Sequence, residues 1–89
     1  MKEKKIIIPN KLGLHARAAA KIVTLTNKFK SIIEITNSDK KADAKSIMKI
    51  LMLAAPQGTE IKITASGKDE SAAIKSLEIL IKAKFNEEH

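Results

Sequence analysis

The chain of 89 residues contains no cysteine, no tryptophan and no tyrosine, and only two of its residues are phenylalanine. Without cysteine it can form neither a disulfide bond nor a thiolate metal site. Its two histidines, His15 and His89, are too far apart in the sequence to indicate a metal site. We therefore expect the protein to bind no metal ion and no cofactor.

Long apolar runs are also missing from the N-terminal region, where Ile6, Ile7 and Ile8 are the only consecutive apolar residues. Three residues are too few for the core of a signal peptide or for a membrane span. We expect one domain over residues 1–89, located in the cytoplasm and without a membrane partner.

The formal net charge of +7 is unevenly distributed along the chain. Residues 1–49 hold twelve basic and four acidic side chains, whereas residues 50–89 hold five and six. This excess makes nucleic acid a possible partner. However, two phenylalanines offer few platforms for base stacking, and no predicted helix gathers basic side chains on one face. A basic surface that attracts acidic proteins explains the same charge, so we expect no nucleic-acid partner.

Hydrophobic periodicity predicts the element order β-α-β-β-α-β-α. The predicted strands cover residues 4–8, 31–36, 41–44 and 60–65, and the predicted helices cover 16–27, 47–54 and 70–84. Pro9-Asn10 is typical of a turn after the first strand. Each strand has one apolar face, and the helices can cover only one side of the sheet. We therefore predict an α+β fold, a two-layer open-faced sandwich with a four-stranded antiparallel sheet and three helices on one face.

Helical spacing also predicts which side chains are buried. In the first helix the expected buried face is Ala16, Ala19, Ala20 and Val23; in the last helix it is Ala73, Ile74, Leu77, Leu80 and Ile81. Residues that favour the N-cap position precede the other two helix starts, Ser46 before the second helix and Asp69 before the last.

The stretch Gly13-Leu14-His15-Ala16-Arg17 places an imidazole at the start of the first predicted helix. The backbone N–H groups there have no partner within the helix, and the positive end of the helix dipole attracts phosphate. His15 is therefore a candidate phosphoryl acceptor. Arg17 is the only arginine of the chain, and its planar donor fork suits phosphate oxygens. The pattern alone leaves open that His15 is merely a polar cap.

The second predicted helix has more apolar residues than one buried face can hold. We predict that Ile47, Met48 and Leu51 form an exposed patch beside His15 that partner proteins cover. The alternative is that these side chains belong to the core. His89, at a polar C-terminus, is expected to be solvated and without function.

Four segments together resemble one known family: Gly13-Leu14-His15-Ala16-Arg17, Lys45-Ser46-Ile47-Met48, Gln57-Gly58-Thr59-Glu60-Ile61, and Ala65-Ser66-Gly67 followed by Asp69-Glu70. The chain resembles the histidine-containing phosphocarrier (HPr) family of the bacterial phosphotransferase system over nearly its whole length. The family's usual proline is replaced by Ala18, which leaves one more backbone donor in the first helical turn.

The resemblance implies a role for three of these residues. His15 would take a phosphoryl group on Nδ1 from phosphorylated enzyme I and pass it to enzyme IIA domains. Arg17 would contact the phosphoryl oxygens. Ser46 would be the serine that HPr kinase/phosphorylase modifies in carbon catabolite regulation. Such a protein is a monomeric carrier in sugar transport and not an enzyme. A regulatory member of a nitrogen-related phosphotransferase branch is the alternative, with a nucleic-acid-binding domain as a less favoured one.

Overall fold

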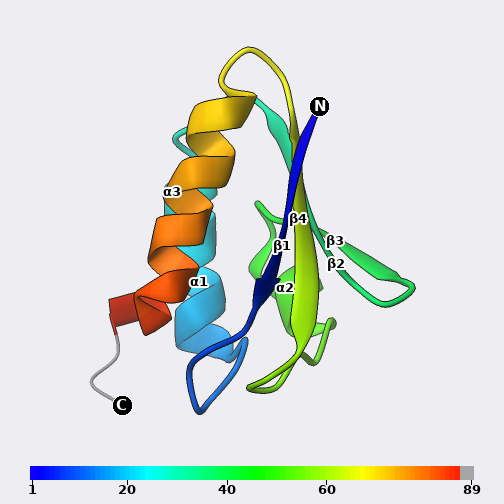
Figure 1. The fold of residues 1–89 in the computed structure, drawn as a ribbon, viewed down its shortest axis with the longest axis vertical. Coiled ribbons are helices and arrows are strands. Elements are labelled where there is room, and N and C mark those ends of the chain that lie inside the picture. The colour runs from blue at the N-terminus through cyan, green and yellow to red at the C-terminus, as the bar shows by residue number, and fades with distance from the viewer. Residues whose placement is uncertain (87–89) are drawn as a thin grey trace.

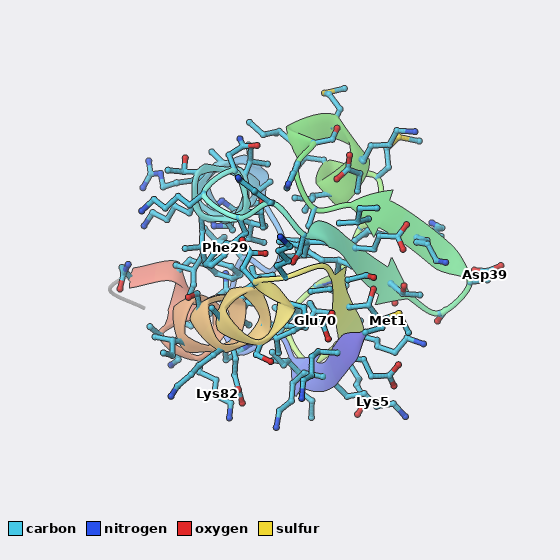
Figure 2. The ribbon with its side chains drawn as sticks, turned by 90° about the horizontal axis from the view of Figure 1, so that it is seen from above. Met1, Lys5, Phe29, Asp39, Glu70 and Lys82 are labelled. Atoms are coloured by element: carbon cyan, nitrogen blue, oxygen red, sulfur yellow. The ribbon has the colours of Figure 1, made fainter. Side chains whose placement is uncertain are left out.

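Four strands form one antiparallel sheet, and α1 and α3 lie side by side against one face of it (Figure 1). The computed structural model describes residues 1–86. Its elements are β1 (Lys2–Ile7), α1 (Ala16–Thr26), β2 (Ile32–Asn37), β3 (Lys40–Asp43), α2 (Ile47–Leu51), β4 (Glu60–Ser66), α3 (Glu70–Lys82) and the 3-10 turn η1 (Lys84–Asn86). Seen from above, all three helices lie on the same side of the sheet (Figure 2). The predicted two-layer fold is therefore confirmed. His89 lies outside the described residues.

The strand order β1-β4-β2-β3 places β4 in the middle of the sheet, between β1 and β2. Buried and more exposed residues alternate strictly along β4, as the sequence predicted. Its inward side chains meet isoleucines of both neighbours, with Ile61 opposite Ile6 and Ile63 opposite Ile35. These side chains form one continuous core with the buried faces of the helices.

Helix α2 is shorter than predicted, because it ends at Leu51 and not at residue 54. The backbone of Ala54 is left-handed, with φ of 49°, a conformation that cannot continue a right-handed helix. Pro56 then disfavours helical geometry at Ala55. The other boundaries differ from the prediction by about two residues or less, the usual scatter at element ends.

The predicted buried face of α1 was only partly right, because Ala19 is fully buried but the centre of the face lies elsewhere. Its buried residues are Ala18, Ala19, Ile22 and Thr26, whereas Ala16 is exposed and Ala20 and Val23 are half-buried. The physical reason is Ile22, a large apolar side chain of this helix that is fully buried. Turning Ile22 into the core carries the residues four positions before and after it to the same face. In α3 the predicted stripe is confirmed, with Ala73, Leu77 and Ile81 buried and its other two members half-buried.

Asp69 occupies the N-cap position of α3, but its side chain makes no bond to that helix. Its carboxylate accepts hydrogen bonds from the backbone N–H groups of Lys30 (2.8 Å) and Ser31 (3.0 Å), and from the Ser31 hydroxyl. The bond from the Ser31 side chain, followed by that from Lys30, lowers the pKa of Asp69. Asp69 thus joins the start of α3 to the start of β2.

We expect Asp69→Asn to lower the melting temperature at neutral pH by about 5 °C, because a neutral amide replaces a charged acceptor of three hydrogen bonds. The pKa of Asp69 is lower in the folded chain than in the unfolded one. Its stabilising effect is therefore present above about pH 4 and is lost as the pH falls through the folded-state pKa. Melting curves of both proteins at several pH values should converge in acid. Asp39→Asn, in the β2–β3 turn, is the control, and a difference independent of pH would contradict the assignment.

Candidate functional site

The loop between β1 and α1 is held against the segment that precedes β4. The backbone N–H of Ile8 donates to the carbonyl of Thr59 (2.9 Å), and that of Leu14 donates to the carbonyl of Ala55 (2.9 Å). Ala55 follows the end of α2 closely in the chain. These two bonds therefore fix the approach to α1 and bring it beside the C-terminal end of α2.

Asn10 and Gly13 shape this loop from inside. Asn10 is fully buried, its Nδ2 donates to the Gly13 carbonyl (2.9 Å), and the Gly13 N–H donates to the Asn10 carbonyl (3.2 Å). Gly13 has a φ of 63°, and a Cβ there would lie 2.4 Å from the Ala55 oxygen and 2.8 Å from Pro56 Cα. Only glycine fits this position. The Pro9-Asn10 pair predicted a turn but gave no sign that Asn10 is buried.

His15 is the N-cap of α1, with an extended backbone (φ −82°, ψ 177°) and a half-buried side chain. Its Nδ1 accepts a hydrogen bond from the backbone N–H of Arg17 at 3.2 Å, and its carbonyl accepts one from Ala19 at 2.9 Å. An acceptor nitrogen carries a lone pair, so a neutral His15 has its ring proton on Nε2. The Nδ1 lone pair thus points at the positive end of α1.

Arg17 lies in the first turn of α1 and is exposed. It is one of the residues that line a hollow of about 520 Å³ between α1 and α3. Three cations line this hollow, Arg17 and Lys21 on α1 and Lys28 just after its end, and the opposite wall includes Ile79 and Leu80. The Lys21 ammonium donates to the Phe85 carbonyl, so it also ties α1 to η1. Positive charge therefore extends along α1 away from His15.

Ser46 is the N-cap of α2 and is half-buried. Its hydroxyl accepts a hydrogen bond from the backbone N–H of Lys49 (3.3 Å), and its own N–H donates to the Asp43 carbonyl (3.1 Å). Beyond the other end of the helix, Asn37 Nδ2 donates to the Leu53 carbonyl (2.9 Å). This short helix is thus held at both ends, and it packs against α1.

Exposed apolar side chains gather on α2. Met48 is 70% exposed and Ile47 is 39% exposed, whereas Leu51 is half-buried and packs against the core. Met52, 69% exposed, was not predicted to belong here, although it is four residues after Met48 and hence on the same helix face. We name Ile47, Met48, Leu51 and Met52 the α2 patch. Leu12, in the loop before His15, is also exposed, and no periodic pattern could have indicated it.

Within residues 1–86, no three histidine, cysteine or acidic side chains come together as a possible metal site. No helix in this part of the chain is both long enough and apolar enough to cross a membrane.

Comparison with known proteins supports one family. The family model described as the PTS HPr component phosphorylation site matches residues 2–83. The phosphocarrier protein HPr of Xylella fastidiosa is 44% identical over 88 residues, which cover 99% of each chain. The phosphocarrier protein NPr of Shewanella violacea is 42% identical over 85 residues, covering 96% of this chain and 93% of that protein.

The same family is found by comparison of structures. The crystal structure of HPr from Thermoanaerobacter tengcongensis superposes with a TM-score of 0.95, at 50% sequence identity and over the full length of both chains. The comparison of sequences and the comparison of structures therefore point to the same family over the length of the chain. The resemblance carried by the four segments is confirmed. The chain belongs to the HPr family of phosphocarrier proteins.

Proposed function

We propose that this protein is the phosphoryl carrier of a phosphoenolpyruvate-dependent sugar phosphotransferase system. In this role His15 accepts a phosphoryl group from phosphorylated enzyme I and donates it to enzyme IIA domains. The observation that carries the proposal is the position of His15 Nδ1, a nitrogen lone pair 3.2 Å from a backbone donor at the start of α1. Family membership supports the same role. We further propose that the chain acts in the cytoplasm as a single-domain monomer.

The chemistry needs a nucleophile, a path for the phosphoryl group and stabilisation of its charge. The Nδ1 lone pair attacks phosphorus, and an N–P bond forms while the bond from phosphorus to its donor breaks. The phosphoryl oxygens then replace Nδ1 as acceptors for the Arg17 N–H, close to the positive end of α1. The Arg17 guanidinium adds charge-assisted hydrogen bonds. The site is only half-buried, so the group can also leave.

Arg17→Lys separates the shape of the donor from its charge. The lysine keeps the positive charge but loses the planar fork, so we expect phosphotransfer from enzyme I to slow by about tenfold. The melting temperature should not change, because Arg17 is exposed. Rapid-quench measurement of transfer tests this, with Lys11→Arg, in the loop before α1, as a control for exchanging the two cations. Equal rates for wild type and Arg17→Lys would mean that only diffuse charge matters.

We propose that the α2 patch is the surface on which enzyme I and enzyme IIA domains dock. Two observations support this. Met48 and Met52 expose large apolar surfaces on one helix face, and the Leu14–Ala55 hydrogen bond ties the loop before His15 to the segment after α2. A partner that covers α2 therefore lies near the phosphoryl group.

We also propose that phosphorylation of Ser46 by HPr kinase/phosphorylase regulates docking. Ser46→Asp tests the effect of charge at this position. Aspartate is itself a good N-cap and interacts favourably with the helix dipole, by about 0.3–1 kcal/mol. The melting temperature should therefore hold or rise slightly. Phosphotransfer from enzyme I should fall by at least about tenfold, because the charge must be desolvated beside the α2 patch when a partner docks.

Ser71→Asp is the matched control, since it adds the same charge to the first turn of α3. Melting and transfer should be measured on one preparation of each variant. If Ser46→Asp melts early, the cap has been lost and the transfer rate is uninformative about charge. If it melts normally and transfers normally, Ser46 lies outside the docking surface.

A nitrogen-related phosphotransferase branch is the alternative, favoured by the similarity to the NPr protein of Shewanella violacea. The two branches differ in their donor, so transfer rates from a sugar-branch and a nitrogen-branch enzyme I distinguish them. Reconstitution with phosphoenolpyruvate, enzyme I and an enzyme IIA domain tests the carrier role itself. We expect phosphorylated enzyme IIA only when this chain is present. A chain that becomes phosphorylated but never passes the group on would contradict a carrier.

A further inference from the structure

Two of the three methionines of the chain lie at α2, and both are unusually exposed, Met48 by 70% and Met52 by 69%. They are four residues apart, and the Met52 N–H donates to the Met48 carbonyl (3.1 Å), so both side chains lie on one face. Peroxide in solution can therefore reach both thioether sulfurs.

The remainder of the chain offers a mild oxidant few other targets. It has no cysteine, tryptophan or tyrosine. The third methionine, Met1, is 79% exposed but precedes β1, at the opposite edge of the sheet from β3, the strand that α2 contacts. Methionine thioethers are common targets of oxidation in proteins and are converted to sulfoxides. Met52 also lines a hollow of about 350 Å³ together with Leu53 and lysines 40, 41 and 49, which leaves room for a small oxidant. The oxidisable sulfur is thus concentrated on the helix that carries the α2 patch.

We infer that Met48 and Met52 form an oxidation site through which peroxides reversibly weaken partner docking. This inference rests on the proposed function, because it takes the α2 patch as the docking surface. In the reaction, a sulfur lone pair attacks one oxygen of hydrogen peroxide. A sulfur–oxygen bond forms and the O–O bond breaks. Sulfur loses two electrons, and the second oxygen leaves with both hydrogens as water.

The structure indicates why oxidation should affect docking and not folding. Neither sulfur belongs to the core, so each sulfoxide can be hydrated in the free protein. A docked partner would remove that water and leave a polar S=O group against an apolar surface, which is unfavourable unless the group is hydrogen-bonded. Methionine sulfoxide reductases A and B return each sulfoxide epimer to the thioether, so the effect can be reversed.

The test treats the purified chain with hydrogen peroxide in the presence of a metal chelator. Peptide mass mapping should show one added oxygen on each of Met48 and Met52. Transfer from enzyme I at subsaturating chain concentration should fall about tenfold, while the melting temperature stays constant. Treatment with both reductases should restore the rate. Oxidised protein that transfers at the untreated rate, or that melts earlier, would overturn the inference.

A variant with Met48→Leu and Met52→Leu provides the matched control, since leucine has a similar volume and cannot be oxidised. The rate of each protein after peroxide is divided by its own untreated rate. After peroxide the double variant should keep its own untreated rate, whatever that rate is. An equal fractional loss in both proteins would mean that peroxide acts elsewhere.

The untreated chain tests the proposed function separately, because failure to accept a phosphoryl group would contradict the carrier role whatever peroxide does. Calorimetric binding to enzyme I, before and after oxidation, then tests the inference without phosphotransfer. Affinity that is unchanged by oxidation, or undetectable in the untreated chain, would overturn it.

Discussion

A chain with His15→Ala is expected to accept no phosphoryl group from enzyme I, because alanine removes the nitrogen lone pair at the start of α1. The fold should persist, since His15 is not part of the hydrophobic core. Loss of the hydrogen bond from the Arg17 N–H to Nδ1 removes a helix cap, which costs about 1 kcal/mol. Intact mass after incubation with enzyme I and phosphoenolpyruvate should show the unmodified chain alone.

His89→Ala is the control for this result, because it removes the only other histidine of the chain. That variant should accept the phosphoryl group at the wild-type rate. Acid-labile phosphorylation that survives His15→Ala and disappears with His89→Ala would identify His89 as the phosphoryl acceptor. That result would contradict our assignment of His15.

Gly13→Ala is expected to destabilise the protein by roughly 2–4 kcal/mol, the largest loss of stability that we predict. One part of this cost is the positive φ of 63°, which disfavours any side chain. The other part is steric, since the new Cβ would lie 2.4 Å from the Ala55 oxygen and 2.8 Å from Pro56 Cα. Both contacts are backbone atoms, so relief requires movement of the loop that delivers His15. Chemical denaturation of variant and wild type measures the loss.

Gly58→Ala separates the two parts of that cost. Gly58 also has a positive φ, of 88°, but a Cβ there would meet no atom within 4 Å. Its substitution should cost only about 1 kcal/mol, the conformational part. The difference between the two variants then measures the close contact at Gly13. Equal losses would show that the loop gives way and that the contact does not hold His15 in place.

The order of elements could be predicted from the sequence because most of them have clear periodicity. Period-two alternation in β4 and the apolar stripe of α3 indicate one buried face each, and both were confirmed. The face of α1 was predicted only in part, with Ala19 buried as expected, because most of its early positions are alanine, which contributes little to a hydrophobic pattern. Ile22 decides how that helix is turned, and its effect depends on the space available in the core.

Contacts between distant segments could not be predicted. Asp69 follows the rule for an N-cap, yet its carboxylate bonds to Lys30 and Ser31 from a distant part of the chain. Asn10 lies in a pair that is typical of exposed turns, yet it is buried. At Asp69 tertiary hydrogen bonds outweigh a local preference. The bonds of Asn10 to Gly13 are local, and its burial follows from how the loop packs, which no local pattern records.

In the candidate site, too, local patterns predicted some features, and others depend on the folded structure. The helical periodicity that begins after His15 placed its imidazole at a helix start, and the structure has His15 as the N-cap of α1. The direction of the Nδ1 lone pair depends on the side-chain torsions of His15, which no sequence pattern encodes. The exposure of Met52 could have been inferred from its spacing to Met48, whereas that of Leu12 depends on the shape of the loop. The phosphoryl-transfer role of His15 stays a prediction.

The most direct test of that role is to identify the atom that carries the phosphoryl group. The chain, with its histidines labelled with ¹⁵N, is incubated with enzyme I and phosphoenolpyruvate, and intact mass and ¹H–¹⁵N NMR spectra are then recorded. We predict the acid-labile gain of one phosphoryl group, bound to Nδ1 of His15, where the lone pair meets the Arg17 N–H. A phosphoryl group on Nε2, an acid-stable modification, or no gain in mass would contradict the account.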